Sequence, residues 1–442
     1  MKRLFQQICS SSCSRPALSG RLVPHGDGAP WLQLLLLLLA AGCAAPRTPV
    51  LTALRDAPGK TPVVFLHGIT GSQLRERDTG RVVWGHSAGF FHPTDRGATL
   101  ACPLDGSDDK LEPFAPIMDV RLCGLKIFEA YGSLARLMTQ NGYQLGDLRH
   151  PKPGDNFFFF VYDWRRSSVS AAQELARQLE KFRRVNVVCQ SGGAYVGRWL
   201  AKYGAASLDE AEAGKTRPLR GVEVAKLIFI GTANGGGIRI LHEMNNGRQY
   251  VPYVGRRIEP EVLFTFPSLY DDLPCYRRDW FFDAAGKPLD VDLYDPANWR
   301  RYGWAGCSST NTPAQNRFLA EQLANAQRFH NLLQQDAPGF GPTRYYSLQN
   351  LYQQTPERAM LVQEDGKWRT LFLDEKAVYS DRIRLALAAS PGDGHATLNS
   401  QWWFSPQEKT AFAQPVAYIE GGHFEIVLNP ATQLRLLEFL AE

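Results

Sequence analysis

The chain has 442 residues, of which 44% are hydrophobic and 21% are charged, as is typical of a folded globular protein rather than a disordered one. Its formal net charge of +5 is small for this length, and no dense run of Lys or Arg follows the N-terminal region. Composition and charge therefore argue against a nucleic-acid-binding protein, and we expect no nucleic acid among its partners.

The first 42 residues have the pattern of a targeting segment. A basic start precedes an apolar run at 31–41, which is too short to cross a bilayer as a mature helix. The run ends in small residues followed by Cys43, the order typical of a bacterial lipoprotein signal in which that cysteine receives lipid. An ordinary secretory signal cleaved nearby is the alternative. We therefore expect a signal peptide at 1–42, a linker at 43–61 and a membrane-anchored lipoprotein of the bacterial cell envelope, at the outer membrane or in the periplasm.

Five cysteines follow Cys43, namely Cys102, Cys123, Cys189, Cys275 and Cys307. An odd number in an oxidising compartment indicates disulfide pairs and one unpaired thiol. Cys189 lies in an apolar strand and is the expected free, buried thiol. The spacing of the others allows the pairs 102–123 and 275–307 but does not fix them.

Short apolar runs alternate with amphipathic segments in the first half of the chain. We expect strands at 63–66, 157–161, 185–188 and 224–230, and helices at 127–138, 168–182 and 195–203. Continuous apolar runs are typical of strands buried on both faces, and their alternation with helices predicts a mostly parallel central sheet with helices on both faces. Residues 75–126 are expected to be rich in loops.

The alternation stops in the second half of the chain. Residues 235–312 are rich in Pro, Gly and aromatic side chains and have no clean period, as expected of a functional insertion over a site. After it we expect a helix at 314–333, strands at 345–348, 384–388 and 416–419, and a closing helix at 431–440.

The segment Val-Val-Cys-Gln-Ser-Gly-Gly-Ala carries the main chemical signal. An apolar strand leads into Ser191, and a helix follows Gly192 and Gly193, which is the context of a nucleophile elbow in an α/β-hydrolase. The usual pattern is G-x-S-x-G, and here Cys189 takes the place of the first glycine. A serine in a tight strand–helix turn without a catalytic role is the alternative.

A glycine-rich turn follows the first expected strand. An oxyanion hole needs preorganised N–H donors, and in this fold they come from the residue after the nucleophile and from such a turn. The expected donors are the backbone N–H groups of Gly192 and Ile69. A phosphate-binding loop is disfavoured because no Lys-Ser or Lys-Thr pair follows the glycines.

The base and acid of a triad must follow the serine in the order Ser, Asp or Glu, His. His423 lies in a Gly-Gly-His loop before the last helix and is the expected base, and Asp393 lies in a Pro-Gly-Asp-Gly turn and is the expected acid. Asp381 is the rival acid, and a plain turn aspartate and a surface histidine are the alternatives. No cluster with metal-ligand spacing is present, so we expect neither a metal nor another cofactor.

Seven segments together resemble the lecithin:cholesterol acyltransferase-like family of α/β-hydrolases, which is related to phospholipid:diacylglycerol acyltransferase and lysosomal phospholipase A2. They are the segments at 63–74, Tyr-Asp-Trp-Arg at 162–165, the elbow at Ser191, and those at 231–236, 268–274, 392–394 and 422–423.

The resemblance implies an α/β-hydrolase domain at 62–442, with a lid segment at about 85–126 and a cap insertion at about 235–312. It also implies a disulfide-closed lid near Cys102 and Cys123, and a structural role for Arg165 in a buried polar network. The implied activity is serine-dependent acyl transfer on lipid esters, with a lipid or phospholipid as acyl donor at a membrane surface.

The acyl acceptor stays open at this point. Water as acceptor gives a lipase or a phospholipase A, whereas an alcohol gives an O-acyltransferase. A non-lipid carboxylesterase with the same triad is one alternative, and a non-catalytic surface lipoprotein that keeps the fold as a binding module is another.

Overall fold

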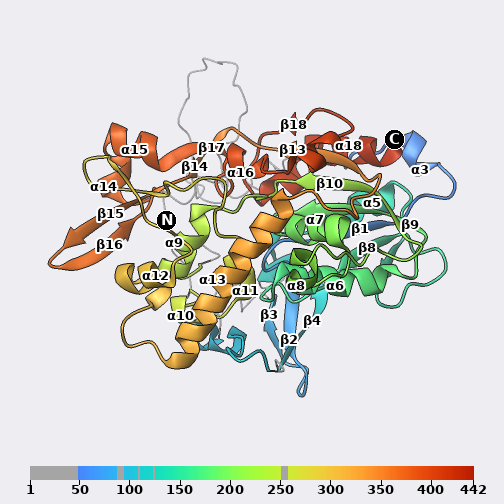
Figure 1. The fold of residues 1–442 in the computed structure, drawn as a ribbon. Coiled ribbons are helices and arrows are strands. Elements are labelled where there is room, and N and C mark those ends of the chain that lie inside the picture. Colours follow the sequence, from blue (N-terminus) through green and yellow to red (C-terminus); the bar gives the residue numbers. More distant parts are fainter. Residues whose placement is uncertain (1–47, 87–93, 108–109, 123–124, 250–256) are drawn as a thin grey trace, which may run out of the picture. The chain divides into compact units, whose positions relative to one another are not determined.

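A seven-stranded sheet forms the centre of the computed structural model, which describes residues 48–86, 94–107, 110–122, 125–249 and 257–442 (Figure 1). The strands lie in the order β18-β13-β10-β9-β1-β8-β7, and every neighbouring pair is parallel. Their bounds are β1 (Val63–Leu66), β7 (Leu145–Asp147), β8 (Phe157–Phe160), β9 (Arg184–Gln190), β10 (Glu223–Ile230), β13 (Arg344–Gln349) and β18 (Ala417–Tyr418). The expected parallel sheet is confirmed.

Helices cover both faces of this sheet, as buried parallel strands require. Even-numbered residues of β1 pack into one hydrophobic cluster and odd-numbered residues into another, because side chains alternate along a strand. The first cluster includes the apolar faces of α6 (Ser168–Leu179) and α7 (Gly193–Tyr203). The second includes those of α5 (Gly132–Gln140) and α18 (Pro430–Ala441). This is the α/β-hydrolase fold.

Short helices and strands fill the segment expected to be a cap insertion. In its described residues they are α9 (Ile238–Asn246), α10 (Pro260–Leu263), α11 (Pro267–Asp271), β11 (Phe281–Phe282), β12 (Pro288–Leu289), α12 (Pro296–Tyr302) and η2 (Trp304–Gly306). β11 pairs with β15 (Ala359–Glu364), which pairs with β16 (Lys367–Leu371) in a four-stranded sheet. The segment at 235–312 therefore folds together with chain that follows β13.

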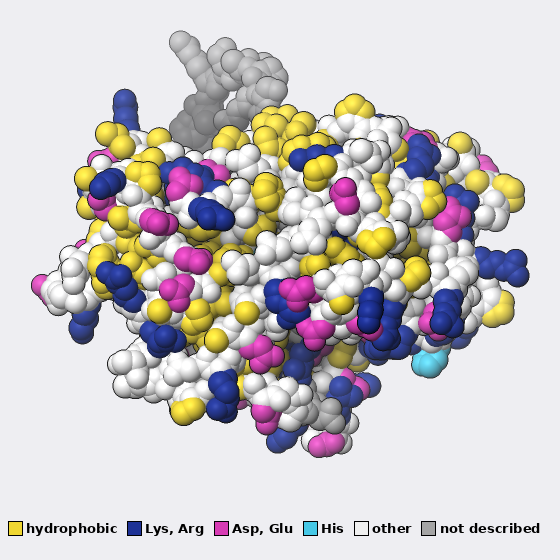
Figure 2. Space-filling model, in the orientation of Figure 1, with side chains coloured by type: hydrophobic (Ala, Val, Ile, Leu, Met, Phe, Trp, Pro, Cys, Tyr) yellow, Lys and Arg dark blue, Asp and Glu magenta, His cyan; other side chains and the backbone are white. Residues whose placement is uncertain are grey.

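Charged side chains of both signs are interspersed over the face shown in Figure 2, in keeping with the small net charge. Within the residues that the structure describes, no helix is both long and apolar enough to cross a membrane.

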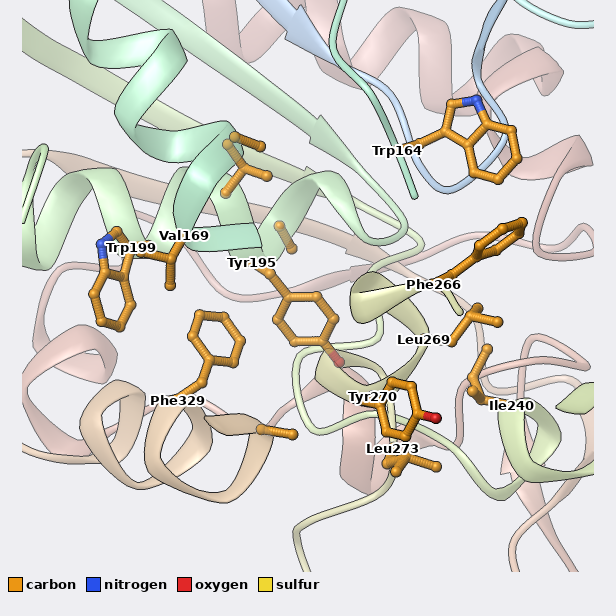
Figure 3. Packing of buried hydrophobic residues seen from close by; sticks show 14 of the residues in the cluster. Trp164, Val169, Tyr195, Trp199, Ile240, Phe266, Leu269, Tyr270, Leu273 and Phe329 are labelled. Atoms are coloured by element: carbon orange, nitrogen blue, oxygen red, sulfur yellow. The ribbon is translucent and has the colours of Figure 1, made fainter. Parts of the chain in front are cut away.

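A long helix, α13 (Pro313–Gln334), closes the cap segment and packs onto the main domain. It begins with a capping box in which Thr312 and Gln315 exchange side-chain and backbone hydrogen bonds. Figure 3 shows Phe329 of α13 facing Tyr195 and Trp199 of α7, with ring centroids 5.7 and 5.5 Å apart. The helix that follows Ser191 is thus buried between the sheet and α13.

One expectation for the N-terminal half is wrong and another is displaced. The region at 75–126 is rich in strands, namely β2 (Ser72–Glu76), β3 (Val82–Trp84) and β4 (Leu111–Pro116) in one antiparallel sheet and β5 (Asp119–Leu122) in another. The helix expected at 127–138 begins only at Gly132, because β6 (Leu125–Glu129) pairs with β5.

The strand expected at 384–388 is also wrong, because this segment belongs to the helix α15 (Arg382–Ala388). The carboxylate of Asp381 accepts hydrogen bonds from the backbone N–H groups of Ile383 and Arg384 and caps the helix. Asp381 is therefore used as a cap. The remaining elements are α3 (Thr52–Arg55), η1 (Thr94–Leu100), α8 (Leu208–Glu212), β14 (Gln353–Pro356), α14 (Lys376–Tyr379), β17 (Ala389–Gly392), α16 (Leu398–Gln401), α17 (Pro406–Thr410) and η3 (Glu425–Leu428).

The cysteines depart in part from expectation. Cys189 is a free, buried thiol, as expected, and burial raises its pKa. Cys275 and Cys307 are also free thiols, so the pair 275–307 is wrong; the Cys275 thiol instead donates to the carbonyl of Gly235 at 3.4 Å. Cys123 lies outside the described residues, and the expected lid disulfide with it. The signal peptide and Cys43 also lie outside them.

Candidate active site

Ser191 sits on a sharp turn between β9 and α7. Its φ angle is 52°, in the left-handed region that non-glycine residues rarely adopt and that a nucleophile elbow imposes. A Cβ atom added to Gly193 would lie 2.5 Å from the carbonyl oxygen of Leu66 and 2.9 Å from that of His67. The end of β1 therefore passes so close to the start of α7 that a glycine is required after the serine turn.

Cys189 fits the elbow because a glycine on α7 makes room for it. A Cβ atom added to Gly197 would lie only 2.5 Å from the Cys189 Sγ. The missing side chain of Gly197 thus leaves the space that the sulfur fills, and Cys189 is fully buried there. A side chain at the position of the first elbow glycine is therefore accommodated by the absence of one at Gly197.

Ser191, His423 and Asp393 form a continuous hydrogen-bonded chain. The Ser191 Oγ lies 2.7 Å from the Nε2 of His423, and the His423 Nδ1 lies 2.7 Å from the Oδ2 of Asp393. The other carboxylate oxygen of Asp393 accepts from the backbone N–H groups of His395 and Ala396 at 2.9 and 2.7 Å. The acid is therefore held by both oxygens, with one aimed at the imidazole.

Burial and charge act in opposite directions on this pair. Burial alone would raise the pKa of Asp393, but the charge and hydrogen bond of His423 hold that pKa below its ordinary value. Burial alone would lower the pKa of His423, but Asp393, with a contribution from the charge of Asp272, holds it above its ordinary value. The site thus favours a protonated imidazole beside an ionised carboxylate once a proton reaches His423.

The loops that carry the acid and the base are tied to each other. The backbone N–H of His423 donates to the carbonyl of Asp393 at 3.0 Å. With its amide turned to suit both neighbours, Gln353 donates to the Asp393 carbonyl at 3.1 Å and accepts from the Gly422 N–H at 3.2 Å. Asn350 donates from its side chain to the carbonyl of Gly421. Polar side chains next to β13 and on β14 therefore set the distance between the two loops.

Two backbone N–H groups lie near the nucleophile: that of Ile69, in the turn after β1, and that of Gly192, directly after Ser191. Neither the Ile69 N–H nor the Gly192 N–H has a hydrogen-bond acceptor among the described residues. A Cβ atom built on Gly192 would lie 3.9 Å from the Ile69 nitrogen, so the two donors are neighbours. Unused N–H groups beside a nucleophile are suited to bind an oxyanion.

His67, at the head of this turn, has a structural role. Its ring stacks on Tyr162 with centroids 4.4 Å apart, and its Nε2 lies 2.7 Å from the Ser72 Oγ. Burial lowers its pKa to about 4, so the ring is neutral near pH 7. The Tyr162 hydroxyl donates to the His67 carbonyl at 2.6 Å, and Arg165, which is fully buried, donates to the partly buried Asp163 carboxylate. The buried polar network expected around Arg165 is confirmed.

Sequence reasoning missed further residues at the site. The His395 ring stacks on the His423 ring with centroids 4.5 Å apart. Asp272 is buried and accepts from the Tyr195 hydroxyl at 3.0 Å; burial raises its pKa to about 7. For His395, the available sequence signal was its position two residues after the expected acid Asp393. For Asp272 the signal was a charged Asp-Asp pair inside an otherwise apolar segment.

The structure thus brings together the five residues expected to form the site, Ser191, Asp393, His423, Ile69 and Gly192. No group of three or more His, Cys, Asp or Glu side chains within the described residues is placed to hold a metal ion.

Comparisons with known proteins support the fold. No family model matches the sequence, and no curated protein matches it. A chain from the crystal structure of the Tle4–Tli4 complex superposes with a TM-score of 0.57 at 13% identity, and the match covers 87% of this chain and 98% of that chain. At this identity the likeness concerns the fold alone.

Two crystal structures of the Bacillus licheniformis lipase BlEst2 match more weakly. The mature form matches with a TM-score of 0.32 at 13% identity, covering 87% of this chain and 93% of that chain. The propeptide form matches with a TM-score of 0.27 at 12% identity, covering 86% of this chain and 51% of that chain. TM-scores this low carry no weight for fold or function.

Proposed function

We propose that this protein is a serine-dependent enzyme that transfers acyl groups from lipid esters through an acyl-enzyme on Ser191. The observation that carries the proposal is the chain of two 2.7 Å contacts from Ser191 through His423 to Asp393, built on a strained turn beside two unused N–H donors.

Each residue then has a defined task. The Ser191 Oγ attacks the ester carbonyl carbon while the Nε2 of His423 takes the hydroxyl proton. The N–H groups of Ile69 and Gly192 donate to the oxyanion of the tetrahedral intermediate. His423 passes its proton to the departing alcohol, which leaves an acyl-serine, and Asp393 holds the imidazole in orientation throughout. An acceptor hydroxyl, activated by His423 in the same way, releases the acyl group.

Exposed aromatic side chains near the site favour a lipid as substrate. Phe424 directly follows His423 and is 46% exposed, Tyr418 on β18 is 43% exposed, and Tyr352 beside Gln353 is 58% exposed. Hydrophobic side chains gather near the upper edge of the view in Figure 2, where β17 and β18 lie. Large exposed apolar side chains beside a reactive serine are suited to contact a lipid or membrane surface.

The N-terminal sequence gives a second reason to propose a membrane surface. We propose that the apolar run before Cys43 directs export and that lipid on Cys43 anchors the protein in the cell envelope. Mass spectrometry of the mature N-terminus tests this: a diacylated or triacylated Cys43 is expected, and an unmodified N-terminus at another residue would contradict it.

The acceptor decides between a lipase or phospholipase A and an O-acyltransferase. Phospholipid with a different label on each acyl chain is incubated with the purified protein, with and without an alcohol acceptor. Labelled free fatty acid indicates water as acceptor, and labelled acyl alcohol indicates transfer. Both products should vanish in Ser191→Ala. Turnover of short-chain esters without any turnover of lipid would favour a carboxylesterase, and no turnover of any ester would favour a binding module.

A further inference from the structure

Gln190 lies directly before Ser191 and reaches across to the turn that carries Ile69. It is buried, and its Oε1 accepts hydrogen bonds from the Gly68 N–H at 3.2 Å and from the Tyr131 hydroxyl at 3.0 Å. The side-chain carbonyl of one residue therefore connects β9, the turn after β1 and the start of α5.

Gly68 needs such a connection because it cannot carry a side chain. A Cβ atom added to Gly68 would lie 2.6 Å from the Cβ and 3.0 Å from the Oγ of Ser191. The residue must therefore be glycine, whose backbone is the most mobile of all residues unless other contacts fix it.

The Gly68 hydrogen bonds set the direction of the Ile69 N–H. The Gly68 carbonyl accepts from the Gly71 N–H at 3.1 Å and faces the Nδ1 of His67 at 2.8 Å. In a planar trans peptide the following N–H points opposite to that carbonyl, so the Ile69 N–H is turned away from these partners. The Gly68 carbonyl is thus held at one end of the residue, and Gln190 holds its N–H at the other.

Tyr131 in turn fixes the Gln190 amide. The Tyr131 ring packs on Phe65, with centroids 5.1 Å apart, and burial raises the pKa of its hydroxyl, which stays protonated and donates. With one acceptor oxygen shared by two donors, the amide cannot turn its NH₂ group toward Gly68 without losing both hydrogen bonds.

We infer that Gln190, oriented by Tyr131, is a positioning residue: it fixes the His67–Gly68 peptide and so holds the Gly68 backbone in the conformation that turns the Ile69 N–H toward the oxyanion. The inference rests on the proposed function and adds residues that act on the transition state without touching the substrate. Loss of the Gln190 acceptor removes this hold on the Gly68 backbone, and the Ile69 donor then contributes less where charge develops.

Gln190→Leu removes the acceptor at similar volume, and Tyr131→Phe removes only the donor that orients it. Gln178→Leu is the matched control, because Gln178 is a buried glutamine on α6 that donates to Glu174 away from the site. Each variant is assayed for kcat and KM on one ester. Each is also assayed for binding of an alkyl trifluoromethyl ketone, which forms an oxyanion on Ser191, and of the matching alkyl alcohol, which forms none.

In Gln190→Leu we expect kcat to fall about tenfold or more, with KM little changed, since loss of a complete oxyanion donor costs about 100-fold or more. The affinity for the trifluoromethyl ketone should fall by the same factor, and the affinity for the alcohol should stay unchanged. Tyr131→Phe should show the same pattern at about threefold, and Gln178→Leu should show neither effect.

Unchanged kcat and unchanged ketone affinity in Gln190→Leu and Tyr131→Phe would overturn the inference and leave the triad proposal intact. Equal loss of ketone and alcohol binding would also overturn it, because that pattern indicates general damage to the site. If Gln190→Leu does not fold, the kcat and ketone affinity of Tyr131→Phe alone decide whether the inference holds. A wild-type protein that neither turns over esters nor binds the ketone would overturn the proposed function and this inference with it.

Discussion

The best-defined contacts on the two sides of the candidate site differ. On the serine side, atoms fill the space so completely that Cβ atoms added to Gly68, Gly193 or Gly197 would meet a neighbour at 2.6, 2.5 or 2.5 Å. On the acid–base side, Gln353 and Asn350 fix the loops through hydrogen bonds. Added volume at Gly68 should therefore disturb the nucleophile, and loss of the Gln353 or Asn350 hydrogen bonds should disturb the acid and the base.

Asp393→Asn tests the acid–base side and should have the largest effect. The amide keeps the shape but cannot hold His423 in the tautomer that accepts the serine proton, so kcat should fall about 10⁴-fold. Steady-state kinetics on a chromogenic ester measures the loss, and thermal unfolding checks that the fold is intact.

Asp381→Asn is the matched control for this change. Asn is also a good N-cap, so α15 should keep its stability to within about 1 kcal/mol and kcat should stay near the wild-type value. A larger loss of kcat in Asp381→Asn than in Asp393→Asn would show that Asp393 is not the acid of the triad.

Gly68→Ala tests the serine side by adding one methyl group. The methyl would overlap Ser191, and relief would move either the nucleophile or the Ile69 donor. We expect kcat to fall about 100-fold or more, as for loss of an oxyanion donor. Gly341→Ala is the control, because open space surrounds Gly341. Near-normal kcat in Gly68→Ala would show that the serine side is not sterically fixed.

Cys189 and Gly197 allow the close packing of the serine side to be tested at residues that do not take part in the reaction. Gly197→Ala should destabilise the protein by about 2 kcal/mol, because its methyl would overlap the Cys189 sulfur. Adding Cys189→Gly should recover a large part of that loss, which denaturant unfolding of the single and double variants measures. Strictly additive losses would mean that the two residues do not share one space.

The pH dependence tests the electrostatics of the acid–base side, with the smallest expected effect. His423 must be neutral to accept the serine proton, and its pKa is raised above the ordinary 6.5. The acid limb of kcat/KM should therefore lie above pH 6.5, with activity rising as pH increases through it.

Asp272→Asn removes a carboxyl group that favours the protonated imidazole when it is ionised, so this limb should move slightly to lower pH. A pH–rate profile from pH 5 to 9 measures the shift. Movement of the limb to higher pH would contradict the assigned role of the Asp272 charge.

The same division explains what the sequence could predict. The strands β1 and β8 are continuous apolar runs buried on both faces, and β9 and β10 are mostly apolar and mostly buried. The glycines next to Ser191 are also visible in the sequence, and they mark places where the backbone must pass close to other atoms. Given this fold, the chain order Ser, Asp, His was then enough to assign the three residues of the triad. These features are local, and the sequence displays them directly.

Other features depend on partners far along the chain. Gln190 and Gln353 acquire their roles only when folding brings Gly68 and Gly422 next to them. No sequence spacing indicates these contacts. The segment at 384–388 is a short, mostly apolar run, as in a strand, yet the Asp381 cap helps to make it a helix. One local signal was missed: Asp365-Gly366, with φ angles of 50° and 73°, forms the tight turn between β15 and β16.

The measurement that tests the central claim most directly is active-site labelling with an alkyl fluorophosphonate, followed by mass spectrometry of the peptides. A reactive hydroxyl held by His423 should form one phosphonyl adduct on the peptide that contains Ser191, at a rate that collapses in His423→Ala. Folded protein that takes up no label, or that is labelled on another residue at an unchanged rate in Ser191→Ala, would contradict the assignment of Ser191 as the nucleophile.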